Sequence, residues 1–522
     1  MTQPLDVISD LAEIRARVRA GDFRADLLGR AQILQQHLAA LKEVGDVDYF
    51  KGLSTVSEIY YYFAKFSEAD KIVAEEGPKI VAELPQWHKP NSNAERAYMK
   101  QKVWVAVHYA QALYRSRMYV QTRHITEVCM RAVEGLLIDP DNPMYGTKSR
   151  LFFVLGQVLR QLQKYEESRD CYLQAIRLSY DRLGRLGPGN DASNEREQAA
   201  ISRGIGLASA LGLGWLDLVR GRLREAEAFI AIGRSLLLRT NDWVNKAYIN
   251  LLYGSLQRLK AGYDSEKLQK AITILEGPYN DFAAHLPYRA RAAHQLALAY
   301  FYRSDYEISM SYVEQVRKIS EAIGDAWWLC NGLIMQSRIA RKMHDLTAAV
   351  ELADTALEKA QGAKEQLAEV DARIANGEAH LELKNYGLAE EQFKNASNLG
   401  GAANGQVRAV CHLHLANTYL KQDLLRDAEQ HINAWSQLKS DVENEVVQDQ
   451  GRRLEAEFKI RMSDFIVSRQ VPTLNYDEHV KRLRDFLIDE ARRRYGNRST
   501  ESVAKELGVT RQTIHNWLHQ SK

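Results

Sequence analysis

Residues 374–396 read IANGEAHLELKNYGLAEEQFKNA, and this stretch decides the fold. Its apolar and small residues follow the 3.6-residue period of two consecutive helices. Gly377 lets a partner helix approach the first helix closely, and Ala389 does the same on the second helix. Phe393 fills the gap between them. The stretch therefore predicts a helical hairpin.

The same offsets recur along the chain, which predicts a repeated hairpin. The small first-helix positions fall at 214, 254, 297, 336, 377 and 416, so they are 39 to 43 residues apart. Ten prolines in 522 residues agree with an almost entirely helical chain. The copies are Gly156, Tyr165, Ser168, Tyr172 and Ala175; Gly214, Ala226, Ile230 and Gly233; Ala416, Leu425, Ala428, Ile432 and Trp435; and, more weakly, Ala297, Tyr306, Ser309 and Val313, and Gln336, Ala348 and Leu352.

This alternation of small and aromatic residues resembles tetratricopeptide repeats over most of residues 50–440. The interval exceeds their usual length of about 34 residues, so we expect helices about one turn longer. The resemblance implies a solenoid whose first helices line a concave groove for a peptide or protein effector. Arginines and amides in such a groove would suit a peptide backbone and its carboxylates. Projected by the repeat offsets, the groove residues are Arg150, Gln157, Tyr248, Arg258, Arg291, His294, Gln295 and Asn417.

A different pattern occupies residues 500–519, TESVAKELGVTRQTIHNWLH. Ala504 is small enough for a second helix to cross close by, and Gly508 suits a sharp turn with positive φ. Thr510 is a good N-cap for the next helix, whose buried stripe is Ile514, Trp517 and Leu518. The side chains left facing outward are Arg511, Gln512, His515, Asn516 and His519.

This segment resembles the helix-turn-helix of bacterial regulators, especially the Fis-like and transposase-like types. A helix at 478–494 and a junction at 494–498 would complete a three-helix unit. The resemblance implies that Arg511, Gln512, His515 and Asn516 reach base edges of double-stranded DNA, while Thr510, His519 and Arg498 hold phosphates. From Lys481 onward the chain carries a net charge of +5 and the remainder −2, which favours contact with phosphates. The alternative is a final capping hairpin of the helical array.

The predicted fold class is all-α, a tetratricopeptide-like solenoid followed by a small three-helix helix-turn-helix domain. The predicted domains are an N-terminal helical cap at 1–50, the solenoid at 51–440, a connecting or capping helix at 441–472 and the helix-turn-helix domain at 476–522. The connecting helix, at 443–469, either caps the solenoid or pairs with a second copy. A homodimer is expected, because two helix-turn-helix units multiply contacts on a palindromic site.

Several classes of function are excluded by what the sequence lacks. No apolar stretch reaches the length of a membrane span, and the first residues do not form an export leader, so a cytoplasmic location is expected. The four cysteines stand far apart among apolar neighbours, as in a reduced core. His412 and His414 point in different directions on one helix, which does not suit a metal. We expect no enzyme activity, catalytic residue, metal or cofactor.

The sequence therefore predicts a sequence-specific DNA-binding transcriptional regulator whose solenoid binds a peptide or protein effector. The alternative is a protein-interaction scaffold whose C-terminal hairpin contacts a protein, for example RNA polymerase, instead of DNA.

Overall fold

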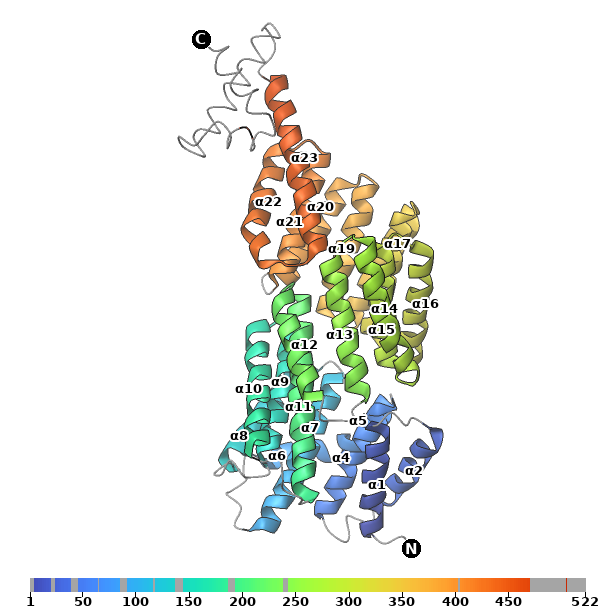
Figure 1. Cartoon of the computed structure of the whole chain (residues 1–522), viewed down its shortest axis with the longest axis vertical. Helices are drawn as coiled ribbons and strands as arrows, with labels where there is room; N and C mark the ends of the chain where they lie inside the picture. The colour runs from blue at the N-terminus through green and yellow to red at the C-terminus, as the bar shows by residue number, and fades with distance from the viewer. Residues whose placement is uncertain are drawn as a thin grey trace.

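The computed structural model describes residues 4–19, 24–38, 46–63, 65–84, 92–115, 118–136, 144–185, 193–237, 243–401, 404–469 and Ala504. These residues form helices and turns and contain no strand (Figure 1). The all-α prediction is therefore confirmed for the described part of the chain. The N-terminal helices are α1 (Pro4–Arg19), α2 (Ala25–Gln36), α4 (Asp46–Tyr62), α5 (Phe66–Ala74), α6 (Glu76–Glu83), α7 (Asn93–Arg115) and α8 (Tyr119–Leu136).

Seven helical hairpins follow, and a long single helix comes after the last of them. The hairpins are α9 (Met144–Gln161) with α10 (Tyr165–Arg185), α11 (Ser193–Val219) with α12 (Leu223–Leu237), α13 (Trp243–Ala261) with α14 (Ser265–Asp281), α15 (Leu286–Tyr302) with α16 (Tyr306–Ile323), α17 (Ala326–Lys342) with α18 (Leu346–Gly362), α19 (Gln366–Glu382) with α20 (Tyr386–Ala396), and α21 (Gly405–Lys421) with α22 (Leu425–Leu438); the single helix is α23 (Glu445–Arg469).

Each of the seven hairpins turns through one residue with positive φ. A left-handed residue lets the carbonyls that end the first helix accept hydrogen bonds from the turn. For example, the Asp345 N–H donates to the Ala340 carbonyl at 2.9 Å. From residue 221 on, the turn residues are 41, 42, 40, 40 and 39 residues apart, in agreement with the predicted repeat length. They are Gln163, Gly221, Gly262, Ser304, His344, Lys384 and Asp423.

The predicted close approach inside the hairpins is confirmed. A Cβ added to Gly377 would lie 2.7 Å from Cε1 of Phe393, and one added to Gly156 would lie 2.9 Å from Cδ1 of Tyr172. Only a glycine leaves room for these rings. Gly214 is different, because the side chain that fills its space is Leu252 of the next hairpin, at 2.6 Å, and not Ile230.

The small second-helix position has a role beyond its size. Where it is serine, the hydroxyl donates to the carbonyl of the small first-helix residue twelve positions earlier. Ser168 donates to Gly156 at 2.7 Å, and Ser309 donates to Ala297 at 2.8 Å. Both hydroxyls are buried, so these bonds satisfy polar groups inside the hairpin and fix the register of its two helices.

The first helices of the hairpins line the inner face of a superhelix. Successive first helices pack on one another from α7 to α21, closer than successive second helices do. The superhelix closes on itself at the α11–α12 turn. There the Glu443 N–H donates to the Gly221 carbonyl at 2.9 Å, and the Arg224 N–H donates to the Glu443 carboxylate at 2.9 Å. This closure brings the end of the last hairpin beside the second of the seven.

Helix α23 caps the last hairpin and also crosses the inner face. It packs on α21 and α22, and its first turns reach α13. Gly451 permits this, because a Cβ there would lie 2.3 Å from Cζ2 of the buried Trp435. Leu454, Phe458 and Met462 pack against the core of the last hairpins. Its far end lies at the opposite end of the molecule from α1 and α2 (Figure 1).

Across the residues that the structure describes, no helix combines the length and apolar character that crossing a membrane requires.

Candidate functional site

An arginine held by aromatic rings lies on the inner face. Arg291 of α15 has its guanidinium carbon 5.3 Å from the ring centroid of Trp215 and 5.4 Å from those of Tyr248 and Trp328. It also donates to the Tyr248 hydroxyl. The rings come from α11, α13 and α17, so four hairpins build this site. Flat aromatic faces stabilise a cation without neutralising it.

A second arginine, Arg258 of α13, is 7% exposed and has its Nε 3.3 Å from Oε1 of Gln295. Its guanidinium carbon lies 5.9 Å from the ring centroid of Tyr302. Burial lowers the pKa of Arg258, with Tyr302 opposing the shift. Among the described residues, no carboxylate forms an ion pair with Arg258 or Arg291. Within the described part of the chain, their positive charge is left without a carboxylate counter-ion.

His294 lies beside these arginines and stays uncharged at neutral pH. Burial lowers its pKa to about 3, and the positive charges of Arg258 and Arg338 add to the shift. Its Nδ1 is buried without a hydrogen bond among the described residues. The charges of the arginines thus dominate this part of the inner face, which suits a negatively charged ligand group.

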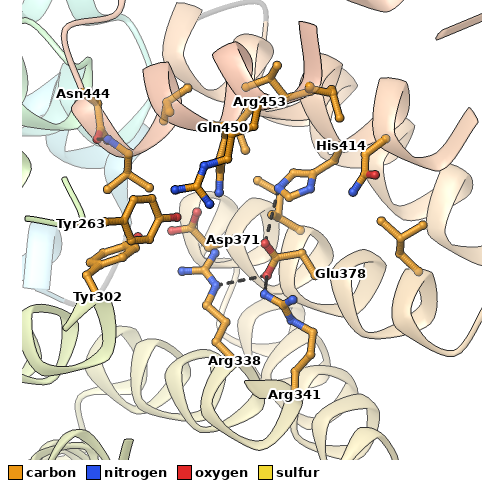
Figure 2. Close-up of a pocket in the computed structure, with 18 of the residues that line it drawn as sticks. Tyr263, Tyr302, Arg338, Arg341, Asp371, Glu378, His414, Asn444, Gln450 and Arg453 are labelled. Carbon is orange, nitrogen blue, oxygen red and sulfur yellow. Dashed lines mark hydrogen bonds and ion pairs between the residues drawn. The ribbon is translucent and has the colours of Figure 1, made fainter. Parts of the chain in front are cut away.

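A cavity of about 440 Å³ continues from the Tyr302 ring toward the C-terminal end. Its walls come from α15, α17, α19 and α21 on one side and from α23 on the other (Figure 2). Tyr263 and Tyr302 pack edge to face at 5.6 Å and form one end of it. The volume is within the range of cavities that hold small ligands or side chains of a peptide.

An ion-pair network around Glu378 forms the floor of this cavity. Glu378 accepts from Arg341 at 3.2 Å, lies 3.6 Å from Nε of Arg338, and lies 3.4 Å from Nε2 of His414. Burial alone would raise the pKa of Glu378, but Arg341, Arg338 and His414 outweigh it and lower the pKa to about 2. His414 also stacks on Phe393 at 4.8 Å. The network joins three successive first helices.

The structure brings together most of the groove residues predicted from the sequence. Tyr248, Arg258, Arg291, His294 and Gln295 form one connected strip on α13 and α15. These five residues are called the arginine strip below.

Three predicted groove residues lie apart from the arginine strip. Asn417 lines the cavity. Arg150 and Gln157 both lie on α9, which is closer to the N-terminal helices than α13 and α15 are. The Arg150 guanidinium carbon lies 4.4 Å from the ring centroid of Trp104 in α7. The predicted DNA contacts Arg498, Thr510, Arg511, Gln512, His515, Asn516 and His519 lie outside the described residues, as does the predicted domain at 476–522 apart from Ala504.

His412 and His414 diverge on α21, in keeping with the expected helical geometry. His412 has its Nδ1 2.9 Å from Nδ1 of His431, whereas His414 faces Glu378. The described residues hold no group of three or more His, Cys, Asp or Glu suited to a metal ion. Cys129, Cys330 and Cys411 are buried, and Cys171 is partly buried.

Sequence reasoning missed the aromatic rings and α23 as parts of the site. Trp215 and Trp328 follow the helical period like core residues, and nothing local distinguishes them from packing residues. The cavity wall supplied by α23 depends on the superhelical closure. Only the helical period of the segment 443–469 could have indicated it.

Comparisons with known proteins agree with the repeat architecture. The family model described as tetratricopeptide repeat matches residues 149–182, which cover most of the α9–α10 hairpin, so this hairpin is a tetratricopeptide repeat. No curated protein matches the chain.

Three solved structures illustrate the likeness. A Rap protein complexed with competence and sporulation factor is 14% identical with a TM-score of 0.44, covering 72% of this chain and 98% of that one. Aspartyl phosphate phosphatase F from Bacillus subtilis is 12% identical with a TM-score of 0.35, covering 77% and 97%. Yeast Tom70 is 12% identical with a TM-score of 0.40, covering 90% and 99%. At TM-scores this low, none of these likenesses bears on what this chain does.

Proposed function

We propose that the inner face of the solenoid binds a peptide or an extended protein segment, and that the arginine strip receives an acidic group of this ligand. The observation that carries the proposal is that no carboxylate of the described ranges pairs with Arg258 or Arg291. A buried guanidinium without a counter-ion is costly, and a ligand carboxylate would offset that cost with charge-assisted hydrogen bonds.

The surrounding rings favour a peptide over a free anion. Trp215, Tyr248 and Trp328 present apolar area beside the charge, and aromatic residues with arginine are the side chains enriched where proteins bind other proteins. The tetratricopeptide architecture supplies an elongated inner surface for such a ligand.

A positional-scanning library of hexapeptides, acetylated and amidated at their ends, tests the proposal on the full chain. The wild type should retain peptides with Asp or Glu at one position. The double variant Arg258→Gln, Arg291→Gln should lose that preference by roughly tenfold or more, because hydrogen bonds to charged groups contribute about 1.5–3 kcal/mol. Arg426→Gln, at an exposed arginine of α22, is the matched control. An unchanged acidic preference in the double variant, or no retained peptide at all, would refute it.

A second candidate function is sequence-specific DNA binding by residues 476–522, as a homodimeric transcriptional regulator. It is supported by the sequence pattern at 500–519 and by the concentration of positive charge there. In the alternative, the same segment contacts a protein such as RNA polymerase. A gel shift with genomic fragments separates them. Retardation that is lost in Arg511→Ala supports DNA binding, and no retardation at low salt supports the protein contact.

A further inference from the structure

One carboxylate in the cavity beneath α23 has no hydrogen-bond or ion-pair partner in the part of the chain that the structure describes. Asp371 of α19 lines the cavity, and among the described residues no group forms a hydrogen bond or ion pair with it. The other three carboxylates of the lining are all paired. Glu378 and Glu382 pair with Arg341, and Glu457 pairs with Arg461. Among the carboxylates of the lining, Asp371 is therefore the one that no ion pair within the described residues neutralises.

The cations near Asp371 already have carboxylates of their own. Arg338 lies 3.6 Å from Glu378, and Arg453 lies 2.7 Å from Asp449. Figure 2 shows the Asp371 carboxylate between Arg338 on one side and Gln450 and Arg453 on the other, with no dashed line reaching it. Burial raises the pKa of Asp371, and the positive charge of Arg338 opposes this shift.

Two aromatic rings complete the surroundings of Asp371. Tyr263 and Tyr302 stand beside its carboxylate at one end of the cavity (Figure 2). A carboxylate next to aromatic faces is a combination that recognises an ammonium or guanidinium group, since the carboxylate neutralises the charge and the rings attract it. The Tyr302 ring also borders Arg258, so the cavity and the arginine strip form one continuous surface.

We propose that the cavity beneath α23 binds the ammonium or guanidinium group of a lysine or arginine side chain, with Asp371 as its counter-ion and Tyr263 and Tyr302 as its aromatic wall. This rests on the proposed peptide-binding function and makes the ligand doubly charged. Its acidic group would lie at the arginine strip and its basic group at Asp371. Because Val446, Gln450 and Arg453 of α23 face the same cavity, the bound side chain would touch α23 directly.

The same hexapeptide library tests the inference, with lysine and its neutral analogue norleucine compared at each position. Wild-type protein should prefer lysine at one position by about tenfold, which corresponds to about 1.4 kcal/mol. Asp371→Asn should abolish this preference and leave the preference for Asp or Glu at the other position unchanged. Glu391→Gln removes an exposed carboxylate of α20 that does not line the cavity, so it should leave both preferences unchanged.

Unfolding without peptide separates a binding role from a structural one. Because Asp371 is partly buried and unpaired, Asp371→Asn should melt at the same temperature as the wild type or higher. A lower melting temperature would indicate a structural role and overturn the inference. Retained lysine preference in Asp371→Asn would also overturn it while leaving the acidic preference, and with it the proposed function, intact. If the wild type showed neither the lysine preference nor the acidic preference, both the inference and the proposed function would be refuted.

Discussion

Replacing Gly451 by alanine should loosen α23 from the last hairpin. The added Cβ would lie 2.3 Å from Cζ2, 2.4 Å from Cε2 and 2.6 Å from Nε1 of Trp435. That ring cannot give way easily, since it is 1% exposed and its Nε1 donates to Glu455 at 3.1 Å. Overpacking of this kind costs about 1–3 kcal/mol. The better helix propensity of alanine returns about 0.8–1 kcal/mol, so the docking of α23 should weaken by up to about 2 kcal/mol.

Gly204→Ala provides the matched control. Gly204 lies inside α11, and nothing stands within 4 Å of an added Cβ. This variant should keep only the propensity gain and stabilise the protein by about 0.8–1 kcal/mol.

Hydrogen exchange followed by mass spectrometry measures the effect where it arises. A loss of 1–2 kcal/mol should speed exchange in residues 445–463 by about 5- to 30-fold in Gly451→Ala. The N-terminal helices α1–α8 should exchange as in the wild type. In one outcome α23 of Gly451→Ala exchanges as slowly as in the wild type, and the variant is stabilised as much as Gly204→Ala. That outcome would mean that α23 does not dock on Trp435 as described.

Three further perturbations test the packing and electrostatics of the solenoid. Gly377→Ala should destabilise the chain by up to about 2 kcal/mol in urea unfolding, because its Cβ would meet the fully buried Phe393 ring at 2.7 Å. Arg169→Met should cost about 3–5 kcal/mol, since Arg169 donates at 2.8 and 2.9 Å to the Asp217 carboxylate, whose side chain is 0% exposed; a loss below 1 kcal/mol would contradict this. Burial lowers the pKa of His285 to about 4 from 6.5, so the stability given by its neutral form is present above about pH 6.5 and is lost as the pH falls toward 4. His285→Gln should therefore narrow the difference between melting temperatures at about pH 7.5 and pH 5, and an equal difference in both proteins would refute this.

The hairpins could be predicted because their determinants are local. Gly377 and Phe393 lie on the two helices of one hairpin, joined by a short loop. The same spacing recurs often enough along the sequence to reveal the repeat. The residues of the arginine strip could be predicted from the same offsets. The helical period of the buried residues in a first helix also determines which of its side chains face the inner surface.

The remaining features depend on distant parts of the chain. Trp215 and Trp328 meet Arg291 only after four hairpins have stacked. Within their own helices they follow the same period as ordinary core residues. The cavity exists because the chain near Glu443 returns to Gly221, and local patterns cannot fix that superhelical closure. That no ion pair within the described residues neutralises Asp371 follows from which neighbours are paired, and a sequence does not give those pairs.

Photo-crosslinking would show most directly where a ligand binds. A hexapeptide selected from the library, carrying a benzophenone beside its acidic residue, would be irradiated with the full chain and the attachment site read by mass spectrometry. Attachment to residues of α11, α13, α15 or α17 around Trp215, Tyr248 and Trp328 is the expected result, and Arg258→Gln, Arg291→Gln should abolish it. Attachment to the second helices α14, α16 or α18, or to α1–α8, would contradict peptide binding at the arginine strip.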